Sequence, residues 1–499
     1  MFRLINISLL VILLALGGCA TGTSVRPALI IPTPKTYTSG ALSEKTLATN
    51  DVPGGNTQQF VLGDDIPAQW WQLFKSEELN RIIRMALSRN PTLAGAQATL
   101  REAQENYNAR VGSEYYPDIS ANLSMLRQKS SPAAAGLPDG TKGSIFNLHH
   151  ASIEVSYTFD IFGSGRKELE SLKASVDYQR FQFEAAYLTL TANIVTTVIK
   201  EASLREQLSA FNDILSTQEK HLSMLDQQMA LGASSRTEIL AQRAQLEQTR
   251  ASLPSIEKEL SQVRHQLMVL MGKTPDEESG ISNFSLSGIT LPEDIPISLP
   301  STLVRQRPDI QAAEALLNVA SARVGVATAN LYPQIILNGS YGAQAARLEN
   351  LFDANNMVWN IGAGLIQPIF NGGRLRAQRR SAIAGFEAAS AQFCQTVLLS
   401  YANVADALRA LETDSRTLKA QSDAFAAARD SLEMTQQQLS AGAVNYILLL
   451  NAQRQYQQAR ISLIQARAAR LSDTAALFQA LGGGWWNRTE PLPVEKLKE

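Results

Sequence analysis

Four short segments of the chain alternate apolar and polar residues with a period of two. In residues 118–125, for example, Ile119 and Leu123 alternate with Ser120 and Asn122. This period places apolar side chains on one face of a strand and polar side chains on the other. The pattern fits a lipid-facing barrel strand and also a half-buried strand of a soluble sheet. We predict strands over residues 116–126, 150–161, 334–343 and 357–369.

Two long segments have the spacing of three and four between apolar residues that indicates a helix. No proline occurs between Arg166 and Pro254, and no glycine occurs between Arg166 and Gly232. A helix of roughly sixty residues at about 1.5 Å per residue reaches about 100 Å, so it needs lateral packing. Shorter return helices are expected to complete two helical hairpins, over residues 166–271 and 374–481.

This arrangement occurs twice along the chain. Ala109–Gly112 (ARVG) matches Ala322–Gly325, and Tyr116-Pro117 matches Tyr332-Pro333, at an offset of about 210 residues. Further along, the stretch DIFGSGR matches PIFNGGR. We therefore predict two structural repeats over residues 76–272 and 301–482, joined by an equatorial connector over 273–300 and followed by a C-terminal tail over 483–499.

The stretch TFDIFGSGRKELE (158–170) has the outline of a phosphate-binding glycine loop. However, the partner residues of such a loop are missing at the required spacing, and the glycines recur at the same joint of the second repeat. Glycine allows the sharp turn that a chain needs between a strand and a helix. We therefore interpret the glycines as strand-to-helix turns: Gly163, Gly165, Gly372 and Gly373.

The N-terminus has the features of a bacterial lipoprotein signal. One positive charge is followed by the apolar run Leu4–Leu16 and by the small residues Gly17 and Gly18 before Cys19. We predict a signal peptide over residues 1–18, a covalent lipid on Cys19 and an acylated N-terminal segment over 19–75. The alternative is an ordinary signal peptide with a chance cysteine.

Composition excludes several other classes. The formal net charge is −1 with 45 basic and 46 acidic residues, so no nucleic-acid partner is expected. The four histidines lack metal-ligand spacing, and no nucleophile–base pair or carboxylate pair has useful spacing. We therefore expect no enzymatic activity, no metal site and no cofactor apart from the lipid on Cys19.

Taken together, these features resemble the outer-membrane factor family of TolC-like channels, and within it the NodT-type outer-membrane lipoproteins of tripartite, RND-type efflux systems. The stretch QWWQLFKSEELNRIIRMALSRNPTL (69–93) resembles the entry segment of that group, and GASSRTEIL and GAVNYILLLNAQR resemble its two hairpin tips. The resemblance implies an α+β membrane protein. It would be a homotrimer in which four strands per chain form a 12-stranded outer-membrane β-barrel, continued by a long periplasmic α-helical barrel.

The resemblance also implies a function and partners. The chain would be a passive exit duct for small molecules (drugs, toxic compounds or metal ions), gated at its periplasmic helical tips by an adaptor protein. Its partners would be that adaptor, an inner-membrane pump reached through the adaptor, and outer-membrane lipid. It would lie in the bacterial outer membrane, lipid-anchored on the periplasmic side. The alternatives are a duct for protein secretion and a pore-less periplasmic coiled-coil scaffold.

The site residues follow from the same resemblance. Adaptor contact is implied for six residues at the hairpin turns: Gly232, Ala233, Ser234, Gly442, Ala443 and Val444. The periplasmic gate is implied for Thr237, Glu238, Tyr446, Ile447 and Asn451. Asn451 departs from the family, which commonly has an aspartate there. The residues themselves leave alternatives open: the glycines as helix C-caps, Glu238 as a solvated residue at a helix start, and Tyr446 as a packed aromatic.

Overall fold

The computed structural model describes residues 34–489 except 39, 41–42, 51, 132–137, 139–141 and 281–282. It contains two compact units. The sheet unit comprises Leu100–Gln179 and Ala313–Phe393, and the helical unit comprises residues 34–99, Arg180–Ala312 and residues 394–489. The predicted signal peptide, Cys19 and the end of the predicted tail lie outside the described residues.

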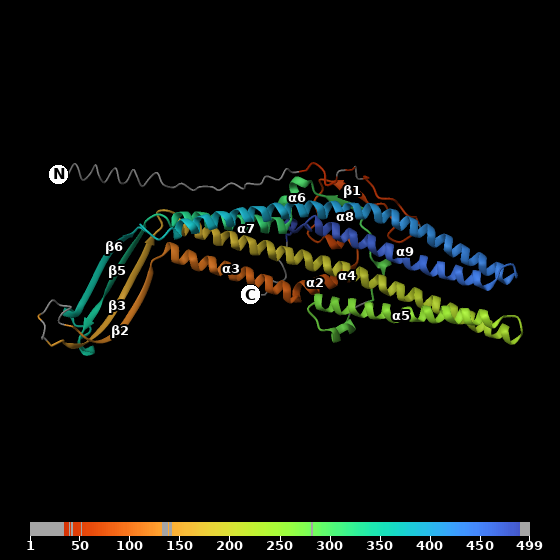
Figure 1. Cartoon of the computed structure of the whole chain (residues 1–499), viewed down its shortest axis with the longest axis horizontal. Coiled ribbons are helices and arrows are strands. Elements are labelled where there is room, and N and C mark those ends of the chain that lie inside the picture. The colour runs from red at the N-terminus through yellow and green to blue at the C-terminus, as the bar shows by residue number, and fades with distance from the viewer. Residues whose placement is uncertain are drawn as a thin grey trace. The chain divides into compact units, whose positions relative to one another are not determined.

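The sheet unit is built on one antiparallel sheet of four strands, in the order β2-β3-β5-β6 (Figure 1). The strands are β2 (Asp118–Lys129), β3 (Ile145–Phe159), β5 (Gln334–Ala345) and β6 (Met357–Ile366). The strand predicted over 357–369 ends three residues early in the structure, because its partner β5 begins at Gln334, opposite Ile366 and directly after Pro333. β3 starts earlier than predicted, at Ile145.

The register of this sheet gathers most of the apolar residues on one face. Ile119 lies opposite Val155, Val155 opposite Gly339, and Gly339 opposite Ile361. Odd-numbered residues are therefore aligned across all four strands, and even-numbered ones such as Ser120 share the other face. Many large apolar side chains on the odd-numbered face are exposed, up to 83% for Ile361.

Helices leave one end of the sheet (Figure 1). They are α3 (Pro91–Tyr115), α7 (Pro308–Ala329) and the first turns of α4 (Ser164–Ala230) and α8 (Arg374–Ser440). Leu317 and Val324 of α7 pack against Phe386 of α8. Short 3-10 helices, η5 (Leu348–Asn350) and η6 (Ala354–Asn356), form part of the connection between β5 and β6.

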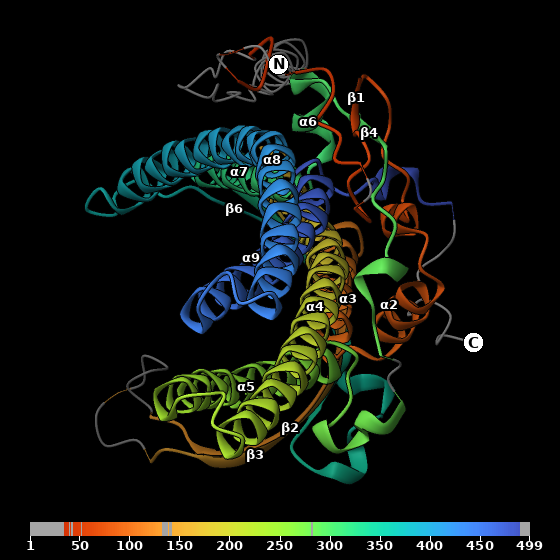
Figure 2. The same ribbon diagram turned by 90° about the vertical axis from the view of Figure 1, so that its right-hand side faces the viewer.

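The helical unit contains two helical hairpins. The remainder of α4 is followed by α5 (Arg236–Leu270), and the remainder of α8 by α9 (Tyr446–Ala480). The outgoing helices have 67 residues each and the return helices 35 residues each. Figures 1 and 2 show both hairpins, with their turns at the same end of this unit.

A belt of shorter elements packs on these hairpins. Its core contains Trp70, Phe74 and Phe478, with the rings of Trp70 and Phe478 5.5 Å apart. Strand β1 (Gln59–Leu62) pairs in parallel with β4 (Asp294–Ile297), which joins the predicted N-terminal segment to the predicted connector. The other belt elements are η1 (Trp70–Phe74), α2 (Glu77–Arg89), η3 (Pro275–Gly280), η4 (Leu286–Gly288), α6 (Pro300–Gln306) and η7 (Trp485–Asn487).

Across the described residues, no helix combines the length and the apolar character required to span a membrane.

Candidate functional sites at the hairpin turns and strand-to-helix joints

Both hairpin turns are closed by the same C-cap. Gly232 and Gly442 have φ angles of +75° and +72°, a left-handed conformation that favours glycine. The amide of Ala233 donates to the carbonyl of Gln228, and that of Ala443 donates to the carbonyl of Gln438. This is the Schellman arrangement, so helix capping accounts for the glycines. The turns are nevertheless exposed, and Leu231 beside Gly232 has 85% of its surface accessible.

The return helix α5 begins with a capping box. The Ser235 hydroxyl accepts from the Glu238 amide, and the Glu238 carboxylate accepts from the Ser235 amide at 2.8 Å. The hydroxyl of Ser234 also donates to that carboxylate. These hydrogen bonds, that of the Ser235 amide first, lower the pKa of Glu238. The structure thus gives Glu238 a helix-capping role within one chain.

Helix α9 begins differently. Its N-cap is Asn445, whose side chain accepts from the amide of Leu448 at 3.1 Å. The third helical position is Leu448 and not a glutamate, so no reciprocal bond forms there. Tyr446 is buried, whereas Ile447 is 59% exposed.

Tyr446 ties the two hairpins together. Its hydroxyl donates to Oε1 of Gln242 on α5 at 2.8 Å, and the amide group of Gln242 donates to the backbone carbonyl of Gln218 on α4. Apolar residues from both hairpins surround the bond, including Leu225 and Leu449. Burial raises the pKa of Tyr446, which keeps the hydroxyl protonated as a donor. Tyr446 therefore has both features that the sequence left open: its ring is packed, and its hydroxyl forms a hydrogen bond between the hairpins.

Further polar contacts join α4 to α9. Gln453 lies 3.0 Å from Nδ1 of His221. Arg460 forms an ion pair of 2.8 Å with Asp213, and Arg467 one of 2.7 Å with Glu206. Gln242 and these partners were not among the sequence-predicted gate residues. Glutamine and arginine recur throughout these helices. The sequence therefore does not distinguish those that join the hairpins from those on a solvated helix face.

The other predicted tip residues lie at the surface. Thr237 is exposed in the first turn of α5, and Asn451 is exposed in the second turn of α9. Ser234 and Val444 are half-buried in the hairpin turns. The structure thus brings Tyr446 into the contact between hairpins, and leaves Thr237, Ile447 and Asn451 at the surface.

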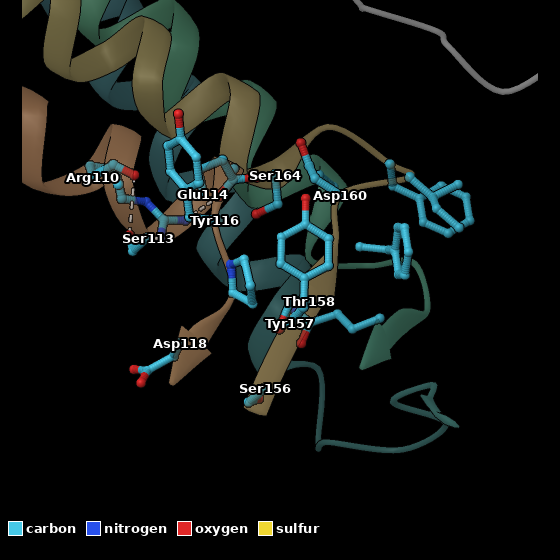
Figure 3. A pocket seen from close by; sticks show the side chains of 18 of the residues that line it. Arg110, Ser113, Glu114, Tyr116, Asp118, Ser156, Tyr157, Thr158, Asp160 and Ser164 are labelled. Atoms are coloured by element: carbon cyan, nitrogen blue, oxygen red, sulfur yellow. Dashed lines mark hydrogen bonds and ion pairs between the residues drawn. The ribbon is translucent and has the colours of Figure 1, made fainter. Parts of the chain in front are cut away.

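The first strand-to-helix joint surrounds a polar cavity of about 510 Å³ (Figure 3). Arg110 on α3 bridges two carboxylates, Glu114 and Glu168, with both distances 2.9 Å. Asp160 accepts from the backbone amide of Arg166 and forms an ion pair with its side chain. Burial raises the pKa of Glu114, and Arg110 partly opposes this shift. Both arginines of this joint, Arg110 and Arg166, are therefore paired with carboxylates.

Glycine occupies these joints for two distinct physical reasons. Gly163, Gly372 and Gly373 have positive φ angles of +82°, +61° and +84°, as the turn interpretation requires. Gly165 does not turn the chain, because it lies inside α4 without a positive φ. A Cβ atom at Gly165 would overlap the Glu114 carboxylate, so glycine provides space there.

An aromatic pair also connects the two repeats at this joint. Phe162, after β3, stacks on Tyr332, before β5, with a centroid distance of 5.0 Å and an interplanar angle of 10°. In the alignment of the two repeats, Phe162 corresponds to Phe370, after β6, and Tyr332 corresponds to Tyr116, before β2. These two residues are 90% and 69% exposed.

A buried arginine holds the N-terminal segment on α9. The guanidinium of Arg470 is fully buried and donates to neutral oxygens of Thr46, Gly54, Asn56 and Gln58. Burial raises the pKa of the nearby Asp414 to about 7, and Asp473 beside it adds to the shift. The Oδ2 atom of Asp414 is buried without a hydrogen-bond donor, so a proton on one of the two carboxyls satisfies this pair.

Within the described residues, no group of three or more histidine, cysteine, aspartate or glutamate side chains is arranged to hold a metal ion.

The fold, a four-stranded sheet followed by two long helical hairpins, is that of known outer-membrane channels. In the solved structures, the outer-membrane channel OprN matches 93% of this chain and 99% of its own with a TM-score of 0.80 and 26% identity. The sequence model described as outer membrane efflux protein matches residues 82–273 and 299–483. The chain therefore belongs to the outer membrane efflux protein family, whose members are outer-membrane channel proteins.

Curated relatives agree with this assignment. The pyoverdine export outer membrane protein OpmQ of Pseudomonas aeruginosa is 30% identical over 430 residues, which cover 85% of this chain and 89% of OpmQ. The outer membrane protein OprJ of the same organism is 28% identical over 486 residues, or 96% of each chain. The protein is thus an efflux protein of the outer membrane.

Proposed function

We propose that three copies of this chain form the outer-membrane exit duct of a tripartite efflux pump, through which small molecules leave the cell passively. A periplasmic adaptor would contact the hairpin turns, and an inner-membrane pump would supply the energy through that adaptor. The observation that carries the proposal is the four-stranded sheet, which has a continuous exposed apolar face and unpaired edges at β2 and β6.

An unpaired strand edge in lipid leaves backbone groups without partners, so only a closed barrel satisfies such a sheet. One chain has too few strands, since about eight are needed merely to enclose packed side chains. Three chains with four strands each supply twelve. In this barrel the odd-numbered face would meet lipid, and the even-numbered face would line the lumen.

The internal repeat suggests how the copies pair. Within the chain, β3 pairs with β5 and Phe162 stacks on Tyr332. The corresponding elements at the free edges are β6 with Phe370 and β2 with Tyr116. Repeating the same arrangement between copies places Leu365 of β6 next to Ala121 or Leu123 of the neighbouring copy. All three belong to the odd-numbered face, which is what a continuous lipid-facing band requires.

Disulfide cross-linking tests this pairing in membranes. Leu365→Cys combined with Ala121→Cys, or with Leu123→Cys, should give a covalently linked trimer after mild oxidation. The matched control is Leu365→Cys with Asn122→Cys, which places the second thiol on the opposite face of the same strand. Equal cross-linking of the control, or monomers throughout, would reject the barrel.

The hairpin turns support the adaptor contact. Leu231, Leu240 and Ile447 are apolar and more than half exposed near the turns, where a folded monomer gains nothing from their exposure. In the duct, the contacts that join the hairpins, led by Tyr446 with Gln242, would hold the tips together until the adaptor separates them. The tip residues first implied by the resemblance, from Gly232 to Asn451, keep their proposed roles at this mouth. A lipid on Cys19 would anchor the N-terminal segment on the periplasmic side.

The proposed function is tested in a strain from which the gene has been deleted. This strain should be more susceptible than the wild type to the exported compounds, and reintroducing the intact gene should restore resistance. OpmQ is named for pyoverdine export, so export of pyoverdine belongs in the same panel. The secretion-duct alternative predicts loss of a secreted protein without a change in susceptibility, and the scaffold alternative predicts no conductance in planar bilayers.

A further inference from the structure

The second strand-to-helix joint carries a concentration of positive charge. Arg374, Arg376, Arg379 and Arg380 all fall within the first two turns of α8. Arg379 is half-buried and donates to the hydroxyl of Thr328, whereas the other three side chains are exposed. In the part of the chain that the structure describes, none of the four forms an ion pair with a carboxylate.

The sequence around this joint contains no acidic residue to balance the charge. Between residues 315 and 386, the only acidic residues are Glu349 and Asp353. Both lie in the connection from β5 to β6, at the end of this strand pair that is opposite to α8. The four arginines also lie at the N-terminal end of a helix, where the dipole disfavours positive charge. The stability of the single chain therefore does not explain them.

The charges at the first strand-to-helix joint can be compared with those at the second. In the first joint, the carboxylates at Glu114, Asp160 and Glu168 pair with Arg110 and Arg166. In the alignment of the two repeats, the positions of these carboxylates are occupied by Ala327, Pro368 and Arg376. The second joint has thus kept and added basic groups while it lacks every acidic partner of the first.

An exposed apolar residue lies between the sheet and the arginines. Ile369, three residues after the end of β6 and five before Arg374, is 95% exposed. The corresponding residue of the first joint, Ile161, is only 42% exposed. An apolar band followed within a few residues by clustered basic side chains is typical of the boundary between the acyl chains and the headgroups of a membrane.

We propose that the second joint, through Arg374, Arg376 and Arg380, binds the phosphate groups of anionic phospholipids in the periplasmic leaflet of the outer membrane. This inference rests on the proposed function, because it takes the odd-numbered face of the sheet as the lipid-facing one. Ile369 would contact the acyl chains beneath the headgroup. Arg376 and Arg380 are four residues apart and share one face of α8, so one lipid phosphate can contact both.

Native mass spectrometry of the full-length protein tests the proposal. The protein in detergent is offered equal amounts of phosphatidylethanolamine, phosphatidylglycerol and cardiolipin. Wild-type protein should retain the two anionic lipids over phosphatidylethanolamine by roughly tenfold or more. The triple variant Arg374→Gln, Arg376→Gln, Arg380→Gln should lose this preference. The control variant Arg236→Gln, Arg243→Gln, Arg454→Gln removes the same charge from exposed arginines of the helical unit and should keep it.

Each of four results in this experiment would overturn the proposal. They are equal retention of all three lipids by wild-type protein, an unchanged preference in the triple variant, a preference lost equally in the control variant, and displacement of phosphatidylglycerol by about 10 mM inorganic phosphate, which would indicate a site for a free anion. The wild type gives a readout that is independent of any variant, since an ionic contact must weaken between about 0.05 and 0.5 M ammonium acetate.

The disulfide-linked trimer separates this inference from the proposed function. If the cross-link forms and the lipid preference is absent, only the lipid site fails. If the triple variant no longer gives the linked trimer, the arginines contact the neighbouring copy, and the lipid assignment is wrong. Failure of the cross-link in otherwise wild-type protein rejects the barrel itself.

Discussion

The hydroxyl of Tyr446 donates a hydrogen bond of 2.8 Å to Oε1 of Gln242, and this bond joins the return helix of one hairpin to that of the other. The two residues are 204 positions apart in the sequence. Since both side chains are buried, water does not replace the bond when it is intact. The pair is therefore a well-defined point at which to test whether the hairpin turns form a gate.

Tyr446→Phe should loosen this gate. The substitution keeps the packed ring but leaves the Gln242 oxygen without its donor, at a cost of about 1–3 kcal/mol. We expect higher single-channel conductance, or longer open times, in planar bilayers. Tyr456→Phe is the matched control, because Tyr456 also lies on α9 and packs against Phe425. Wild-type conductance in Tyr446→Phe would remove this pair from the gate.

Ser235→Ala should fray the start of α5. Loss of the N-cap typically costs about 1 kcal/mol, so amide exchange in the first turn of α5 should accelerate several-fold. Ser252→Ala, inside the same helix, should leave that turn unchanged. Acceleration that extends evenly through α5 would point to general destabilisation.

The same turn should respond to pH. The folded-state pKa of Glu238 is lowered from its ordinary value of 4.5, so its stabilising contribution is present above that value. The contribution is lost as pH falls through the lower folded pKa. Amide exchange at the start of α5, corrected for its intrinsic pH dependence, should therefore increase below pH 4.5 in wild-type protein and change less in Glu238→Gln. An equal increase in both proteins would show that Glu238 does not cause the pH dependence of this turn.

The raised pKa of Asp414 predicts that the stability of the fold depends on pH. Its pKa is raised from 3.8 to about 7 in the folded state, so the folded chain binds more protons than the unfolded chain between these values. Stability from this group must therefore fall as pH rises from 3.8 towards 7. Asp414→Asn should flatten that part of the Tm–pH curve, whereas Asp423→Asn, an exposed residue on the same helix, should not. Identical slopes would show that the Asp414–Asp473 pair does not hold a proton.

Cys19→Ser tests the predicted acylation, which lies outside the described residues. Metabolic labelling with radioactive palmitate should mark the wild type and not the variant. The disulfide-linked trimer should still form in the variant if the barrel assembles without the lipid. Labelled variant protein would place the lipid elsewhere.

The fold was predictable where the sequence is periodic over many residues. The alternation in β2, β3, β5 and β6 determined the faces of the sheet, and the absence of glycine and proline determined the length of α4. The repeat then located equivalent joints. Single contacts across the fold were not predictable, because Gln242 looks like any glutamine on a solvated helix. Gly165 was misread for a related reason: neighbouring glycines suggested one shared turn, whereas Gly165 makes room for Glu114 from another helix.

The equal lengths of the paired helices constrain how this protein can change. An α-helix advances by a fixed rise per residue, so one extra turn in α4 displaces its tip by about 5.4 Å. Such an insertion would separate Gln242 from Tyr446 unless α5, α8 and α9 all gained the same turn. Insertions or deletions in the hairpin helices are therefore tolerated only when both repeats change by the same length. Related chains with longer or shorter hairpins are expected to differ by the same whole number of turns in each half.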